Sequence, residues 1–499
     1  MPEVVRDAAT TDEEGVTGGA SAAAHVAPQG GAGTGTRPAA ARRPVGATAA
    51  SSRQGAGSRQ GDSGDHDDLP HGSRLDRWVD AYAARTRGMT ASEIRALFAV
   101  ASRPEVVSLA GGMPALTALP LDVVGDALAR LVANRGAVAL QYGSGQGDPG
   151  LRERILDVMA PQQVAAHPDD IVVTTGSQQA LDLVARIFID PGDVVVAEAP
   201  SYVGALGVFS AYQADVAHVP LDDEGLIPEA LEITLAELAA AGRRVKLLYT
   251  VPNHHNPAGV TLSAERRPRI VEIARRHGVL IIEDDPYGLL GFAGGPLTSL
   301  HALAPDGVLY LGSFSKTFAP GFRVGWAVAP HAVREKLVLA SEAAILCPSA
   351  FSQLAVATYL DDHDWRHQVE VFRGLYAERA AAMLDALSDL IPRARWTTPK
   401  GGFYVWLTLP DGLDAKAMLP RAVTERVAYV PGTAFYADGQ GRQSARLSYC
   451  YPPPERIREG VRRLAGVVNT ELEMLETFGP DTTHGTGRHG VDFPAPDLT

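Results

Sequence analysis

The sequence predicts an α/β fold with a mainly parallel sheet, because short β-branched runs alternate with segments of helical periodicity. The clearest strands are expected at 171–174, 194–197, 245–250, 279–282 and 308–311. Helices are expected at 178–189, before Asp190-Pro191-Gly192, and at 264–277, before Gly278. In such sheets ligands bind beyond the carboxyl ends of the strands. The loops that follow these strands are therefore where a functional site is expected.

The composition disfavours several classes of protein. Lysine and arginine number 45 against 58 aspartate and glutamate residues, and the formal charge of −13 disfavours nucleic acid as a main partner. The only cysteines, Cys347 and Cys450, lack metal-ligand spacing, so neither a disulfide framework nor a metal site is expected. No apolar stretch of about 18 residues and no signal-peptide pattern occurs. We therefore expect a cytoplasmic protein without a membrane span.

The two ends of the chain differ from the rest in composition. Residues 1–75 are rich in small and polar residues and contain almost no large apolar ones, so they are predicted to be a disordered, low-complexity extension. The last residues, from about 478, have the same character, and a flexible tail is expected over 471–499.

A lysine lies between two serines in the segment SFSKTFAPGFRVGW, residues 313–326. Lys316 follows one apolar strand-like run and precedes another, which disfavours the alternative that it is an ordinary solvated lysine. An uncharged lysine amine can form a Schiff base with pyridoxal 5′-phosphate (PLP), while hydroxyls and an arginine hold the phosphate. Lys316, Ser313, Ser315 and Arg323 could supply these groups within one loop.

Polar residues also follow three other predicted strands; the first two are followed by the turns at Gly176 and Asn256. Gly176, Ser177 and Gln178 open a helix whose N-terminus could bind a phosphate, although Ser177 could equally be a simple N-cap. Asn256 precedes Pro257 in a turn, where an ordinary Asx turn is the alternative.

Asp284, Asp285 and Tyr287 follow a fully apolar strand. Acidic residues at strand ends are commonly solvated, but a carboxylate at this edge could pair with the protonated pyridine nitrogen of PLP. His254 and His255 invite a metal hypothesis, which we set aside for a structural or substrate-lining role because no third ligand is evident.

In this order the motifs resemble those of the class I/II aminotransferases, which are fold-type I PLP enzymes. The resemblance runs from about 90 to 466, and residues 89–114 are similar to the subgroup of 2-aminoadipate, kynurenine and broad-specificity aromatic aminotransferases. It implies a large PLP-binding domain over 121–340 with a mainly parallel seven-stranded sheet. It also implies an N-terminal arm over 76–120, which contributes to a smaller α+β domain completed by 341–470.

The resemblance also implies a role for each site residue. Lys316 would carry the cofactor, Asp284 would bind its pyridine nitrogen, and Tyr287 would complete the catalytic group. The cofactor would further be held by Ser177, Gln178, Tyr202, Asn256, Ser313, Ser315, Arg323 and, from a partner subunit, Tyr142. The substrate would contact Arg446, Asn256 and Gly112.

The implied activity is transfer of an amino group from an L-amino acid to a 2-oxo acid by a ping-pong mechanism, in a homodimer. Two alternatives stay open. Another PLP reaction, of β-lyase or α-oxoamine synthase type, would use the same lysine and aspartate. A PLP-sensing transcription regulator would need a winged-helix domain, for which residues 1–75 offer no core-forming pattern.

Overall fold

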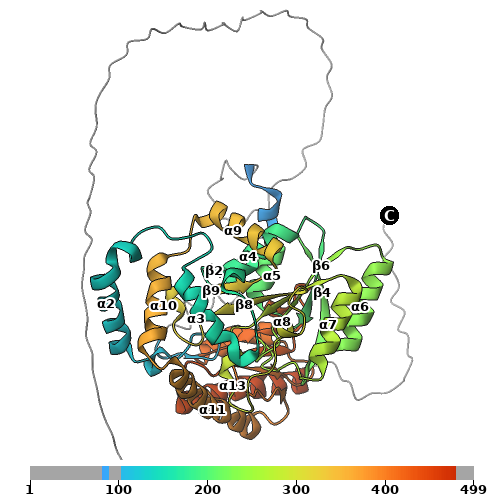
Figure 1. Cartoon of the computed structure of the whole chain (residues 1–499). Helices are drawn as coiled ribbons and strands as arrows, with labels where there is room; N and C mark the ends of the chain where they lie inside the picture. The colour runs from blue at the N-terminus through green and yellow to red at the C-terminus, as the bar shows by residue number, and fades with distance from the viewer. Residues whose placement is uncertain (1–80, 89–102, 479–499) are drawn as a thin grey trace, which may run out of the picture. The chain divides into compact units, whose positions relative to one another are not determined.

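The computed structural model of the protein describes residues 81–88 and 103–478 (Figure 1). The predicted disordered extension, residues 1–75, lies outside the described residues, as does 479–499. Residues 471–478, which were expected in the flexible tail, are instead the end of helix α13 (Pro454–Phe478). The helix continues because it is amphipathic and buries Leu472 in the core.

The main sheet is mainly parallel, as predicted. Its five central strands, β8, β7, β6, β3 and β4, run parallel, whereas β9 lies antiparallel between β8 and β2 at one edge. The strands are, in spatial order, β2 (Ile171–Thr174), β9 (Gly325–Val328), β8 (Val308–Ser313), β7 (Leu280–Asp284), β6 (Val245–Thr250), β3 (Val194–Ala199), β4 (Asp215–Asp222) and β5 (Gly225–Leu226). All five strands expected from the sequence are present in this sheet.

The sheet has eight strands in the described residues rather than the seven expected. The additional strand is β5, which pairs antiparallel with the end of β4 through a two-residue turn. Gly225 closes that turn with a φ of +87°, a conformation that glycine adopts without steric cost. The sequence reasoning did not identify this hairpin because its second strand is only two residues long.

Helices cover both faces of the sheet, which explains why its strands are continuously apolar. One face packs against α4 (Ser177–Phe188) and α5 (Val203–Ala211), and buries Val195 and Ala197 of β3. The other face packs against α6 (Pro228–Ala240), α7 (Arg266–His277) and α8 (Leu300–Leu303), and buries Val194 and Val196. Neighbouring side chains of one strand thus enter opposite cores.

A second, antiparallel sheet follows in the chain. It has the order β10 (Arg395–Trp396), β11 (Tyr404–Thr408), β14 (Ser444–Ser448), β13 (Val430–Pro431). The long helices α11 (Trp365–Leu390) and α13 pack against each other beside it, and α12 (Ala415–Thr424) packs on α13. A parallel pair joins β1 (Val107–Ser108), near the start of the second described range, to β12 (Val427–Ala428), which follows α12.

The predicted division between domains at residue 340 falls within helix α9 (His331–Ile345). The following helix, α10 (Ala350–Asp362), packs against α2 (Leu121–Ala139) and α3 (Pro149–Met159), which precede the main sheet in the chain. These contacts cross the predicted division and do not fix where one domain ends, so the domain boundaries stay a prediction. Within the described ranges, no helix combines the length and the apolar character needed to cross a membrane.

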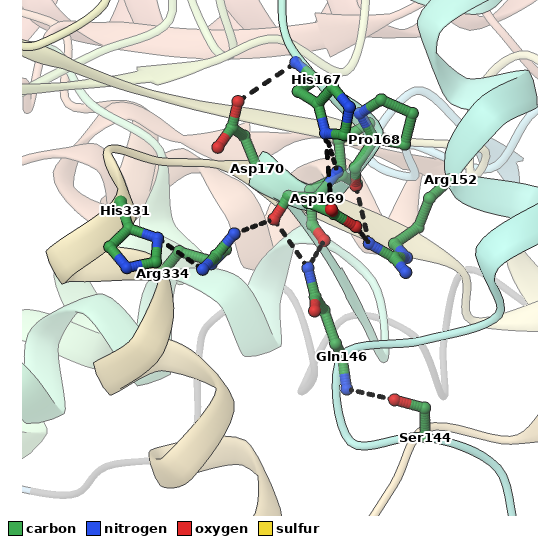
Figure 2. Close-up of polar contacts among 10 residues, drawn as sticks. Ser144, Gln146, Arg152, His167, Pro168, Asp169, Asp170, His331 and Arg334 are labelled. Carbon is green, nitrogen blue, oxygen red and sulfur yellow. Dashed lines mark hydrogen bonds and ion pairs between the residues drawn. The ribbon is translucent and has the colours of Figure 1, made fainter.

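The loop that carries Tyr142 is anchored on the turn before β2 (Figure 2). Gln146 Nε2 donates to the backbone oxygens of Asp169, at 2.8 Å, and Ile171, at 3.0 Å. Arg334 of α9 donates to the same Asp169 oxygen at 2.6 Å. The loop is thus fixed to the main sheet, while the Tyr142 residue is 76% exposed.

Candidate active site

A cavity of about 240 Å³ lies beyond the carboxyl ends of β3, β6, β7 and β8. Twelve of the sequence-predicted site residues line it: Gly112, Ser177, Gln178, Tyr202, Asn256, Asp284, Tyr287, Ser313, Ser315, Lys316, Arg323 and Arg446. Tyr142 does not line it. Four lining residues were not predicted: Val251, Pro286, Pro320 and Tyr404. The rule that parallel strands direct ligands to one edge thus located the site.

Lys316 follows β8 and extends into the cavity. Its Nζ donates to the backbone oxygen of Gly112 at 2.9 Å and lies 5.6 Å from the centre of the Phe403 ring. Burial, with a smaller contribution from the positive charges of Arg446 and Arg323 and against an opposing effect of Cys450, lowers the pKa of this amine to about 8. A larger share of neutral amine makes Lys316 a better nucleophile toward a carbonyl carbon.

Asp284 is the last residue of β7 and is 3% exposed. Its Oδ2 accepts a hydrogen bond from the Tyr249 hydroxyl at 2.8 Å, and its Oδ1 has no partner among the described residues. Burial raises the pKa of this carboxyl to about 7; Asp285 adds to the shift, and the Tyr249 bond opposes it. A buried carboxylate with a free oxygen fits a cationic N–H donor, which a protonated pyridine ring supplies.

An anion site lies at the N-terminus of α4. Gly176 is the N-cap, with a φ of +76° and no side-chain cap, so Ser177 is the first helical residue and the simple N-cap interpretation of it is wrong. A Cβ on Gly176 would lie 2.6 Å from Arg323 Nη2. Ser313 and Ser315 bond each other at 2.8 Å on the same wall. Free N–H groups, hydroxyls and a guanidinium together fit a phosphate group.

Arg446 lies on β14 and also lines the cavity, where it is 2% exposed. It donates from Nη1 to Asn256 Oδ1 at 2.8 Å and from Nη2 to the backbone oxygen of Ala110 at 2.6 Å. The Asn256 side chain therefore bonds across the cavity instead of to its own turn, contrary to the Asx-turn alternative. A buried guanidinium that faces the cavity fits a substrate carboxylate.

Two of the predicted tyrosines, Tyr202 and Tyr287, also line the cavity. The Tyr202 hydroxyl donates to Gln178 Oε1 at 3.2 Å, and burial, with the nearby Asp284 charge, raises the Tyr202 pKa to about 12. Burial also raises the pKa of Tyr287, whose hydroxyl donates to the Tyr404 hydroxyl at 3.5 Å. Both phenols are therefore neutral hydrogen-bond donors at physiological pH.

The two histidines next to Asn256 face away from the cavity. His255 Nε2 lies 3.0 Å from the buried Glu198 carboxylate, and His254 Nδ1 lies 3.1 Å from the Thr261 hydroxyl. Neither lines the cavity. Of the two roles considered for them, this placement favours the structural one.

Sequence reasoning missed Tyr404, which begins β11 after a Gly-Gly turn in GGFYVWL. Its ring lies 4.2 Å from the Arg446 Cζ atom. A glycine pair that opens a short apolar strand was the available signal. No local pattern, however, says which face of that strand meets a distant cavity.

Comparison with known proteins identifies the family. The family model described as "Aminotransferase class I and II" matches residues 104–464, which is more than half of the chain. The chain belongs to the class I and II aminotransferases. It is therefore a PLP-dependent transaminase, which moves an amino group between an amino acid and a 2-oxo acid.

Relatives of this aminotransferase span several named substrates. It is 42% identical over 396 residues to aromatic-amino-acid aminotransferase 1 of Thermococcus litoralis, a match that covers 79% of this chain and 95% of that one. It is 39% identical over 403 residues to the 2-aminoadipate transaminase of Thermus thermophilus, covering 80% and 99%. The structure of kynurenine aminotransferase from Pyrococcus horikoshii matches with a TM-score of 0.77 at 40% identity, covering 80% and 100%.

Proposed function

We propose that this aminotransferase holds its cofactor by the residues that line the cavity, with Lys316 as the covalent attachment point. Asp284 binds the pyridine nitrogen, and Asn256 and Tyr287 bind the phenolic oxygen. The phosphate lies at the N-terminus of α4, against Ser177, Ser313 and Arg323. The observation that carries this assignment is the free, buried Oδ1 of Asp284 in the same cavity as the amine of Lys316.

The substrate is oriented by Arg446. A carboxylate bonded to its guanidinium places the Cα–H bond of the amino acid toward Lys316. Once released from the cofactor, the Lys316 amine removes the proton from Cα of the substrate and then delivers it to the cofactor. Its lowered pKa suits both transfers. When bound, PLP supplies the electron sink that makes this proton acidic. Asp284 maintains the sink because its negative charge keeps the pyridine nitrogen protonated.

Covalent trapping tests the attachment point. The PLP-loaded protein is treated with borohydride, digested, and analysed by peptide mass spectrometry. We expect the added mass on the peptide that contains Lys316, and no stable adduct in the Lys316→Ala variant. Lys336→Ala, which removes an exposed lysine on α9, is the matched control and retains the adduct. An adduct on any other lysine would overturn the assignment.

We further propose that the amino donor has a neutral, preferably aromatic, side chain. Among the described residues that line the cavity, the cations are Lys316, Arg323 and Arg446, and each has a partner in this assignment. No described cation lining the cavity is then left for a second carboxylate. The aromatic rings of Tyr202, Tyr287 and Tyr404 would instead contact an apolar or aromatic side chain.

A donor panel tests this choice. Phenylalanine, tyrosine, kynurenine and 2-aminoadipate are each mixed with the PLP-loaded enzyme without any oxo acid, and the loss of the cofactor's visible absorption is followed. We expect the aromatic donors to have the higher kcat/KM in this half-reaction. A faster reaction with 2-aminoadipate would contradict the neutral-donor proposal and leave the transaminase activity intact.

We propose that the enzyme is a cytoplasmic homodimer in which Tyr142 contacts the cofactor phosphate of the other subunit. Tyr142 and Leu140 are 76% and 72% exposed and lie two residues apart in the same loop region. Such a cluster of exposed apolar residues is typical of an interface. Both cysteines are free, in keeping with a reducing compartment.

Mixing two inactive variants tests the shared site. In a hybrid of Lys316→Ala and Tyr142→Ala subunits, one site regains both residues, so we expect about a quarter of the wild-type activity after random exchange. A hybrid of Lys316→Ala with Asp284→Asn is the control and stays inactive, because both residues serve the same subunit's site. Equal failure of both mixtures would contradict the role of Tyr142.

A further inference from the structure

Tyr404 contacts two groups of the site at once. It lies on β11 opposite Ser448 of β14, two residues along from Arg446, and its ring centre is 4.2 Å from the guanidinium carbon of Arg446. Its hydroxyl accepts from the Tyr287 hydroxyl at 3.5 Å, and the two rings meet edge to face with an angle of 85°. Arg446 and Tyr287 are thus connected through a single side chain.

The Tyr404 hydroxyl is closely surrounded. A Cβ on Gly112 would collide with it, so the glycine backbone packs directly against the oxygen. The titratable groups around the two phenols are Arg446, Cys450 and Tyr202. Burial raises the pKa of Tyr404 and Arg446 opposes this shift, so the phenol is neutral and is polarised by the nearby cation.

We propose that Tyr404 is a positioning residue that transmits the state of Arg446 to Tyr287. This inference rests on the proposed function in one respect, namely that Tyr287 donates its proton to the phenolic oxygen of the cofactor. Tyr287 then has an oxygen free to accept a bond from the Tyr404 hydroxyl, which lies within reach. A donor that also accepts a hydrogen bond donates more strongly, because consecutive bonds polarise one another.

The consequence is a second connection between Arg446 and the residues proposed to hold the cofactor. The direct one runs from Arg446 Nη1 to Asn256 Oδ1 at 2.8 Å. The second runs through the Tyr404 ring and hydroxyl to Tyr287. A substrate carboxylate neutralises Arg446 and so reduces its pull on the Tyr404 phenol. Tyr287 then donates less strongly, and carboxylate binding changes the proton affinity of the cofactor linkage at Lys316.

A pH titration of the visible absorption of the PLP-loaded enzyme tests the role of the hydroxyl. Tyr404→Phe keeps the ring over Arg446 and removes the hydroxyl. The phenolic oxygen of the cofactor is then stabilised less, so the cofactor linkage at Lys316 holds its proton more tightly. The pH midpoint of the absorption change should rise by roughly half a unit. Tyr287→Phe should raise it further. Tyr449→Phe, which removes a buried hydroxyl bonded to the Gly401 oxygen, leaves the midpoint unchanged.

A non-reacting monocarboxylate gives a second readout. In the wild-type enzyme it shifts the midpoint upward, and in Tyr404→Phe the shift is smaller because only the Asn256 connection is left. Tyr404→Leu, which also lacks the ring, should give the raised midpoint together with a higher KM for the amino acid. This second variant keeps the test available if Tyr404→Phe is not stable.

The outcomes separate the two levels of the argument. If Tyr287→Phe raises the midpoint and neither Tyr404 variant does, Tyr404 does not act through Tyr287 and the inference fails. If Tyr287→Phe also leaves the midpoint unchanged, the proposed contact between Tyr287 and the cofactor fails first.

Discussion

The two sides of the end of strand β7 use the same residue types for different purposes. Asp284 faces the cavity and leaves one buried oxygen without a partner. Glu283 and Asp285 face the other side, where every carboxylate oxygen is bonded. Glu283 accepts from the backbone N–H groups of Leu300 and His301 at the start of α8. Asp285 accepts from Asn253, Tyr310 and Gln162. Burial is common to all three; the unfilled oxygen distinguishes Asp284, to which we assign the functional role, from the other two carboxylates.

The largest effect is expected from Asp284→Asn. An amide cannot keep the pyridine nitrogen protonated, so kcat/KM should fall roughly 10³-fold, within the range for loss of an essential acid or base. The cofactor-free variant should not be less stable than the wild type at neutral pH, because the substitution removes a buried charge without an ionic partner. Steady-state kinetics and calorimetry on the same sample measure both. If kcat/KM of Asp284→Asn stays within tenfold of the wild-type value, Asp284 does not differ in function from the carboxylates on the other side of β7.

The opposite pattern is expected from Asp285→Asn. The amide presents an N–H₂ group to a neighbouring amide donor and leaves a buried group unsatisfied. The free energy of unfolding in urea should fall by about 2 kcal/mol. Turnover per folded, PLP-loaded site should stay within a few fold of wild type. A loss of turnover as large as that of Asp284→Asn would show that both sides serve the chemistry.

The pH dependence of stability gives a third contrast. Burial raises the pKa of Asp284 to about 7. Its neutral form therefore favours the folded state fully below the unfolded carboxyl pKa, and this contribution is lost as pH rises to about 7. Relative to Asp284→Asn, the cofactor-free wild type should lose on the order of 2 kcal/mol between pH 4 and pH 7. Glu283 titrates in both proteins and cancels in the difference.

Urea unfolding at several pH values measures this difference, and parallel curves for the two proteins would contradict it. Loading with PLP should reduce the slope, because a pyridine N–H favours the ionised carboxylate.

The smallest effects are expected at two serines. Ser299 caps α8, since its Oγ accepts from the Ala302 N–H, whereas Ser177 on the cavity side caps nothing. Ser299→Ala should cost about 1 kcal/mol of stability. Ser177→Ala should leave stability nearly unchanged and weaken PLP binding a few fold. Urea unfolding and equilibrium dialysis measure the two effects, and an exchange of the two results would contradict the assignments.

The sequence was most informative where one local pattern fixes one element. The apolar runs placed the strands of the main sheet, and the edge rule then brought Asp284, Asn256 and Lys316 together. It was least informative where distant segments meet. Tyr404 reaches the cavity because β11 pairs with β14 in a register that aligns Trp406 with Arg446. Such a register depends on the packing of the whole second sheet and has no local signature.

The lack of a local signature also explains two smaller differences between the sequence-based expectations and the structure. Ser177 resembles an N-cap in sequence, and only the backbone of Gly176 shows that the cap lies one residue earlier. Residues 471–478 were placed in the tail, but they read ELEMLETF, and Leu472 packs in the core as part of α13.

The bonds of Arg446 bear on which amines the enzyme can discriminate against. Both of its Nη atoms already hold an oxygen, one from the Asn256 side chain and one from the Ala110 backbone. The remaining Nη hydrogens and Nε, which has no partner among the described residues, are left for a ligand. A carboxylate bonded there gains a charge-assisted pair, whereas an amide gains only a bond to a neutral acceptor and a simple amine gains none. If Arg446 binds the substrate carboxylate as proposed, the donors that the protein leaves unused there favour α-amino acids over amines without a carboxylate.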